Sequence, residues 1–322
     1  MNDYLQTVEA VYAEAAKTPD AELCCTQSPV WRLPDLKIPE RMLAMNYGCG
    51  STVHPRDIHE GATVLYVGVG GGLEALQFAY LTRRPGSVLA VDPVAEMREQ
   101  ARINLEEAAR LNSWFQTDFV RLLDGDAFHL PAENNSVSVV AQNCLFNIFT
   151  TGDLQRALGE VFRVLRIGGL FSTCDPVTPV PLPESLADDE RLRARCISGC
   201  LTIDAYLGAL TDAGFGRIEV RSRSPYRYLH PREYPLLKEP ILLESIEAAA
   251  YKVPDGFDGP EILTGRTAIY FGDQPSFTDQ SGTVLRRGIP QEVSDAAAAR
   301  LQKHPDIFLT PSTWHSKGTA CC

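Results

Sequence analysis

The sequence predicts an α/β protein built on a doubly wound parallel sheet, followed by a smaller α+β region. Two observations predict this fold class. Between residues 62 and 173, short apolar runs alternate with stretches of helical spacing, which is typical of parallel strands connected by helices. The first apolar run ends in the glycine turn Gly68-Val69-Gly70-Gly71-Gly72, which lets a backbone approach a nucleotide-like cofactor closely.

The individual elements follow in order along the chain. Apolar residues at helical spacing predict a first helix over 3–17, which would pack one face on the body of the protein. Short runs that favour β structure predict strands over 62–67, 87–91, 119–123, 137–141 and 170–173. Helices are expected between them over 73–81, 95–111 and 153–165, with a turn over 166–169 before the last strand.

Changes of composition and residue pattern divide the chain into four parts. Residues 1–60 are expected to form an N-terminal helix and a cysteine-bearing cap, and residues 61–180 the cofactor-binding core. After Pro176, prolines and charged residues indicate a substrate-side region over 181–230. Residues 231–322 are expected to form a small α+β domain that ends in Cys321-Cys322.

Composition and charge exclude several classes of function. Lys and Arg number 30 and Asp and Glu 41, and the resulting net charge of -11 would repel nucleic acid. No apolar run approaches the roughly 20 residues that span a bilayer, and the N-terminus lacks a basic region followed by an apolar stretch. We therefore expect no nucleic-acid or membrane partner and a cytoplasmic location. In a reducing cytosol the nine cysteines are expected to be buried, redox-active or metal-binding thiols rather than structural disulfides.

Acidic residues follow the second and third predicted strands. Asp92 could accept hydrogen bonds from both ribose hydroxyls of a cofactor, or could cap the next helix. In Gly125-Asp126-Ala127, the carboxylate and an adjacent backbone N–H could hold an adenine edge, or Asp126 could close a turn. Because the ends of parallel strands meet in one crevice, these features together with the glycine turn favour a nucleotide-like cofactor. The glycine turn alone does not separate dehydrogenases from methyltransferases.

The cysteines narrow the chemistry of the second substrate. Cys144 directly follows the fourth predicted strand, which places its side chain at the mouth of the crevice. Cys196 and Cys200 are four residues apart and would face one side if the segment were helical. Thiolates select soft acceptors such as a trivalent metalloid, whereas zinc favours four ligands in short paired spacings that are missing from the sequence. For any single cysteine, a role as a small buried hydrophobe is the simpler alternative.

Ordered motifs in the core resemble those of class I S-adenosylmethionine-dependent methyltransferases. They are Val64–Gly72, Asp92, Gly125-Asp126-Ala127 and Glu160–Gly169, and a dehydrogenase would lack the last of them. The resemblance implies a Rossmann-like methyltransferase sheet with S-adenosylmethionine as cofactor. It implies that Gly68 and Gly70 approach the methionine part, Asp92 the ribose, and Asp126 with Ala127 the adenine. The expected cofactor-binding set also includes Tyr47, Gly72, Pro93 and Asn143.

Three cysteine motifs resemble the arsenite S-adenosylmethionine methyltransferase family more specifically. They are Asn46–Ser51 around Cys49, Gln142-Asn143-Cys144, and Cys196-Ile197-Ser198-Gly199. The resemblance covers nearly the whole chain, and Leu263–Tyr270 with Cys321-Cys322 resembles the members associated with arsenosugar formation. Departures from the family pattern are Gln142 for a serine, Glu74 for an aspartate, and Cys200 for an alanine.

The family resemblance implies a set of arsenic ligands. Cys144 and Cys196 would hold As(III), within a substrate-side region that becomes the As(III)-binding region. Cys49, with Cys24 or Cys25, would accept arsenic first or cycle through a disulfide. Cys200 is a possible further ligand, and His54, His129 and His230 are expected to be structural or surface residues.

The resemblance further implies an enzyme that methylates arsenite to methyl- and dimethylarsenicals, for detoxification or arsenosugar synthesis. Arsenite would arrive as a thiol adduct, pass from Cys49 and its partner to Cys144 and Cys196, and attack the cofactor methyl through its lone pair. Glutathione or thioredoxin would act as the thiol reductant, and we expect a monomer. Two alternatives stay open: a methyltransferase for an organic small molecule with structural thiols, and a metalloid-sequestering protein.

Overall fold

The structure is a computed structural model that describes residues 3–20, 23, 33–257 and 259–312. In the described part of the chain, a nine-stranded sheet has the order β3-β2-β1-β4-β5-β8-β7-β9, with β6 paired to β5. The first five strands run parallel, and β8 and β7 extend the sheet in antiparallel pairs. The doubly wound parallel core predicted from the sequence is therefore confirmed.

Most elements of the parallel half lie close to the predicted ranges, but the helix over 40–44 was not predicted and the fifth strand is longer than the predicted 170–173. Its strands are β1 (Val64–Val67), β2 (Val88–Asp92), β3 (Val120–Asp124), β4 (Val137–Asn143) and β5 (Leu165–Thr178). Its helices are α1 (Asp3–Lys17), α2 (Glu40–Ala44), α3 (Leu73–Thr82), α4 (Ala95–Leu111) and α5 (Thr151–Val164). The N-cap hydroxyl of Thr150 accepts a hydrogen bond from the Asp153 backbone N–H, which fixes the start of α5 beside the end of β4.

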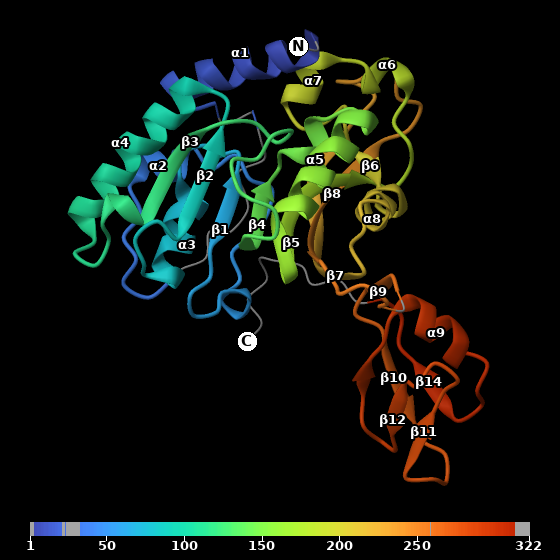
Figure 1. The fold of residues 1–322 in the computed structure, drawn as a ribbon. Coiled ribbons are helices and arrows are strands. Elements are labelled where there is room, and N and C mark those ends of the chain that lie inside the picture. The colour runs from blue at the N-terminus through green and yellow to red at the C-terminus, as the bar shows by residue number, and fades with distance from the viewer. Residues whose placement is uncertain (1–2, 21–22, 24–32, 258, 313–322) are drawn as a thin grey trace.

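Helices cover both faces of the sheet (Figure 1). Along β1, side chains alternate between two cores because successive residues of a strand point to opposite faces. Leu65 and Val67 join the core that includes side chains of α1, α5 and α8 (Ile203–Asp212). Val64 and Tyr66 join the core beneath α2, α3 and α4. No helix among the described residues combines the length and apolarity needed to cross a membrane.

The turn predicted over 166–169 is wrong, because those residues lie inside β5. Gly168 has a φ of +77°, and the pairing with β4 shifts register between Val137 and Val139. The backbone N–H of Gly168 donates to Lys252, and that of Lys252 donates to Gly169. The glycines therefore form an irregularity that β8 holds in place, and the strand continues for 14 residues in all.

The remaining elements lie beyond β5, and β8 and β9, which follow the expected boundary at 230, belong to the main sheet. Those next to the main sheet are α6 (Glu184–Ala187), α7 (Glu190–Ala194), β6 (Leu201–Thr202), α8, β7 (Arg217–Leu229), β8 (Ile241–Tyr251) and β9 (Glu261–Leu263). A small C-terminal unit then projects beyond β9 with its own apolar core (Figure 1). It consists of β10 (Thr267–Tyr270), β11 (Ser276–Thr278), β12 (Val284–Arg286), β13 (Gln291–Glu292), α9 (Asp295–Leu301) and β14 (Ile307–Leu309).

Candidate active site

A cavity of about 420 Å³ lies at the carboxyl ends of the parallel strands. This is the position where open α/β sheets bind ligands, and the volume lies within the range of small-molecule sites. Its walls include residues that follow β1, β2, β3 and β4, together with Leu5, Val8 and Tyr12 of α1. The apolar face of α1 thus helps to close the cavity, a role that its helical spacing alone did not reveal.

The glycine turn after β1 contributes backbone rather than side chains to the cavity. Gly68 and Gly70 line it with φ values of +80° and +51°, a backbone conformation that residues other than glycine rarely adopt. A Cβ atom on Gly70 would meet nothing within 4 Å, so the backbone there is open to a ligand. Gly72, also predicted to bind cofactor, is not among the lining residues; it is the N-cap residue before α3 and lies beside Ala101.

Asp92 and Pro93 line the cavity at the end of β2. The Asp92 carboxylate accepts a 2.9 Å hydrogen bond from the Val94 backbone N–H, which closes a turn ahead of α4. Burial raises the pKa of Asp92 to about 6, while backbone N–H groups of Val94 and Gly70 favour its charged form. Asp92 therefore presents an acceptor, charged at neutral pH, at the position predicted for ribose recognition.

Asp126 and Ala127 line the same cavity after β3. One Asp126 oxygen accepts hydrogen bonds from the backbone N–H groups of Phe128 and His129, at 2.8 and 3.0 Å. The turn-closing alternative for Asp126 is thus realised, and the side chain still lies at the wall of the cavity. His129 is a largely exposed neighbour, and the His230 ring accepts a hydrogen bond from the Arg232 backbone.

Asn143 and Tyr47 connect the cavity to the segment that carries Cys49. Both residues line the cavity. The Asn143 amide accepts from the Cys49 backbone N–H at 3.0 Å and donates to the Gly50 carbonyl at 2.9 Å. The Tyr47 hydroxyl donates to the Ala15 carbonyl at 3.1 Å, which joins this segment to the end of α1. Asn143 therefore holds the Cys49 segment as well as lining the predicted cofactor site.

Cys144 lines the cavity immediately after β4, as its place in the sequence predicted. Its φ is +60°, and its backbone N–H donates to the Cys174 carbonyl at 2.6 Å. The Gln142 side chain accepts from the backbone N–H groups of Leu145 and Phe146, at 2.9 and 3.2 Å, so it fixes the turn that presents Cys144. Gln142 can span both groups because its amide reaches farther than a serine hydroxyl.

Cys196 lies against the turn that carries Cys144. Its thiol donates to the Cys144 carbonyl at 3.2 Å, and Cys196 is fully buried. The segment of Cys196 and Cys200 is not helical, so the condition under which the two thiols would face one side is not met: α7 ends at Ala194 and Cys196 has a φ of +57°. The Cys200 thiol donates to the Cys196 carbonyl at 3.5 Å, and burial raises its pKa. Cys200 therefore helps to hold the backbone of the turn that carries Cys196.

Cys174 is a thiol that the sequence analysis missed. It lies in β5, fully buried, with its sulfur 3.4 Å from the sulfur of Cys49 and 3.2 Å from the Ser245 hydroxyl. Its strand neighbour is Asn143, the residue before Cys144. Cys174 directly follows the strand predicted over 170–173, so the strand-end rule that identified Cys144 would have indicated it as well, although the observed β5 continues to Thr178.

All five described cysteines are buried thiols and none is in a disulfide. Within the described ranges, no group of three or more His, Cys, Asp or Glu side chains is placed to hold a metal ion. The structure therefore brings Cys196 to Cys144 and Cys174 to Cys49, and does not gather Cys49, Cys144 and Cys196 into one centre. Cys24, Cys25 and the Cys321-Cys322 tail lie outside the described residues.

Comparisons with known proteins agree with the geometry of the core. The methyltransferase domain family matches residues 65–173, which span β1 to β5. The arsenite methyltransferase of Halobacterium salinarum is 31% identical over 55% of this chain and 43% of its own length. That of Aquipseudomonas alcaligenes is 32% identical over 55% of this chain and 51% of its own length. The chain thus spans about half the length of the curated relatives it matches.

A solved structure supports the fold over a larger part of the chain. The arsenic(III) S-adenosylmethionine methyltransferase of Chlamydomonas reinhardtii superposes with a TM-score of 0.62 at 22% identity. The match covers 89% of this chain and 98% of the algal protein. Most of the architecture, including parts of the chain beyond the matched domain, therefore has a counterpart among known structures.

Proposed function

We propose that this chain, which belongs to the arsenite S-adenosylmethionine methyltransferase family, transfers methyl groups to trivalent arsenic held by Cys144 and Cys196. The single observation that carries the proposal is the position of two thiols at the end of β4. Cys144 lines the cofactor-sized cavity, and the Cys196 thiol lies 3.2 Å from the Cys144 carbonyl.

The residues of the cavity fit S-adenosylmethionine. The open backbone at Gly70 suits close approach of the methionine part, and the Asp92 carboxylate suits the ribose hydroxyls. Asp126 and Ala127 form the wall expected for adenine. When bound, the cofactor would supply an electrophilic methyl group on a sulfonium sulfur.

Cys144 and Cys196 would prepare the arsenic without a general base. Each thiol hydrogen leaves with a hydroxide of arsenite as water, so that two As–O bonds are replaced by two As–S bonds. The arsenic would keep its lone pair and be held by two buried residues, so that alignment and desolvation would carry the catalysis. The products are expected to be methyl- and dimethylarsenicals, for detoxification or arsenosugar synthesis, with glutathione or thioredoxin as reductant.

The test compares Cys144→Ser and Cys196→Ser with the unaltered protein. We expect each variant to lose at least about 100-fold in arsenite methylation, because alignment of the acceptor supplies much of the rate. Affinity for S-adenosylhomocysteine, measured by calorimetry, should stay within about threefold in Cys196→Ser, a change of less than 1 kcal/mol. Methylated arsenic is measured by mass spectrometry.

Full arsenite methylation by both variants would exclude the proposed ligands. Methylation of an organic acceptor by the unaltered protein, with no methylated arsenic formed, would instead favour the alternative in which the thiols only pack. Uptake of arsenic without release of S-adenosylhomocysteine would favour a sequestering protein.

A further inference from the structure

We propose that Cys49 and Cys174 form a second dithiol site, which takes a trivalent arsenical separately from Cys144 and Cys196. The inference rests on the proposed function for the class of its ligand. Its geometry depends only on the residues around β5 and on the segment that precedes β1.

The separation of the two sulfurs suits one bridging atom. They lie 3.4 Å apart, well beyond the roughly 2.05 Å of a disulfide bond. Two thiolates bound to one soft centre at about 2.3 Å each can lie up to about 4.6 Å apart, so the observed distance is within reach. Because trivalent arsenic is a soft acceptor, a pair of thiols matches its ligand preference.

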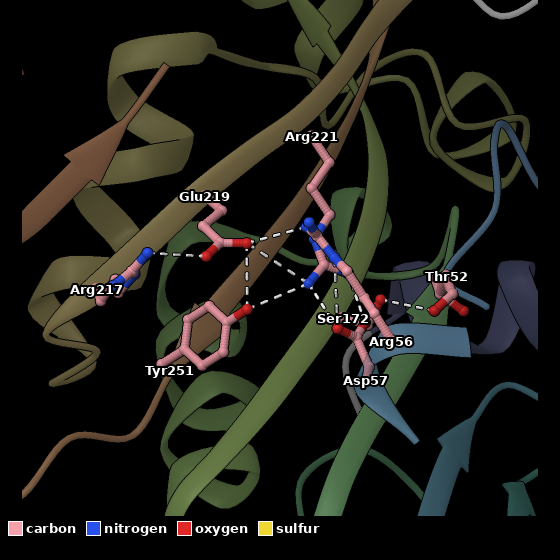
Figure 2. Close-up of polar contacts among 8 residues, drawn as sticks. All are labelled: Thr52, Arg56, Asp57, Ser172, Arg217, Glu219, Arg221 and Tyr251. Atoms are coloured by element: carbon pink, nitrogen blue, oxygen red, sulfur yellow. Dashed lines mark hydrogen bonds and ion pairs between the residues drawn. The ribbon is translucent and has the colours of Figure 1, made fainter. Parts of the chain in front are cut away.

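The segment that carries Cys49 is fastened on several sides. Besides the Asn143 contacts, the Ser51 backbone N–H donates to the Glu247 carboxylate at 2.6 Å. The Ser172 hydroxyl donates to the Thr52 carbonyl at 2.8 Å, as Figure 2 shows. These bonds join the segment to β5 and β8, so that Cys49 is held over Cys174 before any ligand arrives.

A buried ion pair anchors the same segment farther along. Arg221 of β7 donates to the Asp57 carboxylate at 2.8 Å and to the Tyr251 hydroxyl at 3.2 Å, and both partners of the ion pair are nearly buried (Figure 2). Tyr251 in turn donates to Glu219 at 3.1 Å. The segment thus has fixed points on both sides of Thr52, which limits how far Cys49 can move from Cys174.

Gly50 lets the segment that carries Cys49 pass close to the Cys174 sulfur. A Cβ atom at this position would lie 2.4 Å from the Cys174 sulfur and 2.5 Å from the Glu247 carboxylate. Glycine therefore permits the close approach of the Cys49 segment to β5. The two thiols are therefore held together by contacts of the Cys49 segment with β5 and β8.

The chemistry needs no oxidant. An arsenical with two hydroxides forms two As–S bonds while two As–O bonds break, and each thiol hydrogen leaves in a water molecule. Burial raises the pKa of Cys174, and its hydrogen bond with Cys49 adds to the effect, so it stays a thiol at neutral pH. Thiol–disulfide exchange requires a thiolate and is disfavoured here, whereas this condensation consumes the proton.

The experiment counts bound arsenic without cofactor in the full chain. Cys24, Cys25, Cys321 and Cys322 are first changed to serine, so that only the five described thiols remain. The reduced protein is incubated with phenylarsine oxide, whose single phenyl group leaves two positions for thiols, and is desalted before arsenic is measured by mass spectrometry. We expect about two arsenic atoms per chain, one for each soft dithiol site.

The Cys174→Ser variant should bind about one arsenic atom per chain, because one soft dithiol site is gone. Serine preserves the size of the side chain and its contact with Ser245. Cys200→Ser is the matched control and should still bind about two, since Cys200 belongs to neither pair and a serine hydroxyl can still donate to the Cys196 carbonyl. Circular dichroism checks folding, and Cys49→Ser reports on the same pair if Cys174→Ser does not fold.

The results separate this inference from the proposed function. An unchanged arsenic count in both Cys174→Ser and Cys49→Ser would overturn the second site, whatever the methylation activity. A count that falls in Cys174→Ser but not in Cys144→Ser would leave the second site standing and remove the ligands proposed for methylation. A fall in both variants supports both sites.

Discussion

Asp175 is a fully buried carboxyl group between the segments that carry the thiols. It accepts hydrogen bonds from the Gln142 amide and from the Tyr206 hydroxyl, the latter at 2.8 Å. Burial, with a smaller contribution from Cys49, raises its pKa from the ordinary 3.8 to about 8. At neutral pH the group is therefore mostly protonated, and it holds Gln142, which fixes the turn at Cys144.

The raised pKa of Asp175 predicts a particular dependence of stability on pH. Below about pH 4 both folded and unfolded chains are protonated, and the stabilisation from this group is complete. As the pH rises toward 8, the unfolded chain releases the proton first, so this stabilisation is lost. We expect Asp175→Asn to flatten the decline in the free energy of unfolding by up to about 1.4 kcal/mol per pH unit.

Urea unfolding of Asp175→Asn and of the unaltered protein between pH 4 and 8 measures this effect. Asp188→Asn, at an exposed position after α6, serves as the control and should follow the unaltered protein. Parallel curves for Asp175→Asn and the unaltered protein would show that the carboxyl is already ionised when buried.

Single residues were predictable where one rule of chain geometry applied. Asp92, Asp126 and Cys144 follow strands, and all three line the cavity. The contacts of Asn143 with Cys49 and of Cys174 with Cys49 join residues more than 90 positions apart. Such contacts depend on how a segment without regular structure folds back, which local patterns do not encode.

The turn between α7 and β6 shows how an element without helix or strand positions a thiol. A Cβ atom on Gly199 would lie 1.6 Å from the Asn147 carbonyl oxygen. Only glycine permits this approach, which presses the turn against residues 146–148. The contact of Cys196 with Cys144 depends on that approach.

Gly199→Ala is expected to separate the two turns. We predict a loss of about 1–3 kcal/mol in the free energy of unfolding, the usual cost of overpacking, together with loss of arsenical binding at Cys144 and Cys196. Gly208→Ala is the matched control, because a Cβ atom there meets nothing within 4 Å and the residue lies inside α8. It should stabilise the protein by about 0.5–1 kcal/mol, and equal effects in both variants would contradict the packing argument.

Elements with strong periodicity were the most predictable. The predicted helix over 95–111 has the bounds of α4, and that over 3–17 has the bounds of α1. The glycine pair at 168 and 169 indicated a turn, yet backbone bonds with Lys252 keep it inside β5. The turn at Cys196 was not a helix because its contacts come from the distant residue 147 rather than from local propensity.

The whole molecule separates a site-bearing sheet from a C-terminal unit. Among the described residues, every one that lines the cavity lies between Leu5 and Arg156. The unit from β10 onward has its own core around Tyr270 and Leu285. Its apolar residues therefore do not contribute to the walls of the cavity.

A chain that ends at Thr264 is predicted to keep the cofactor site. Its affinity for S-adenosylhomocysteine, measured by calorimetry, should stay within about threefold of the full chain, because none of the described residues that line the cavity belongs to the removed part. A threefold change in affinity corresponds to about 0.7 kcal/mol. Ending at Thr264 retains β9 and its pairing with β7. A loss of more than about tenfold, or 1.4 kcal/mol, would show that the C-terminal unit acts on the site.

At this scale the order of the parallel half followed from the alternation of strands and helices. The addition of β8 and β7 to the sheet did not follow from the sequence. A residue pattern that predicts a strand after residue 216 does not say which edge of the sheet that strand joins. Pro225 and the shift of register near Val220 obscured the length of β7 further. As a result β8 and β9, which come after the expected boundary at 230, belong to the main sheet, and the separate C-terminal unit begins only with β10.

The interior position of β5 in the sheet limits which insertions and deletions the protein can accept. The strand is paired on both sides, so its alternation of side chains is set by two neighbours at once. Removal of one codon between Phe171 and Thr173 would turn Cys174 toward the opposite face and put a different residue beneath Cys49. A point substitution in β5 changes one side chain, whereas an insertion or deletion of one residue would turn a whole row of side chains to the opposite face.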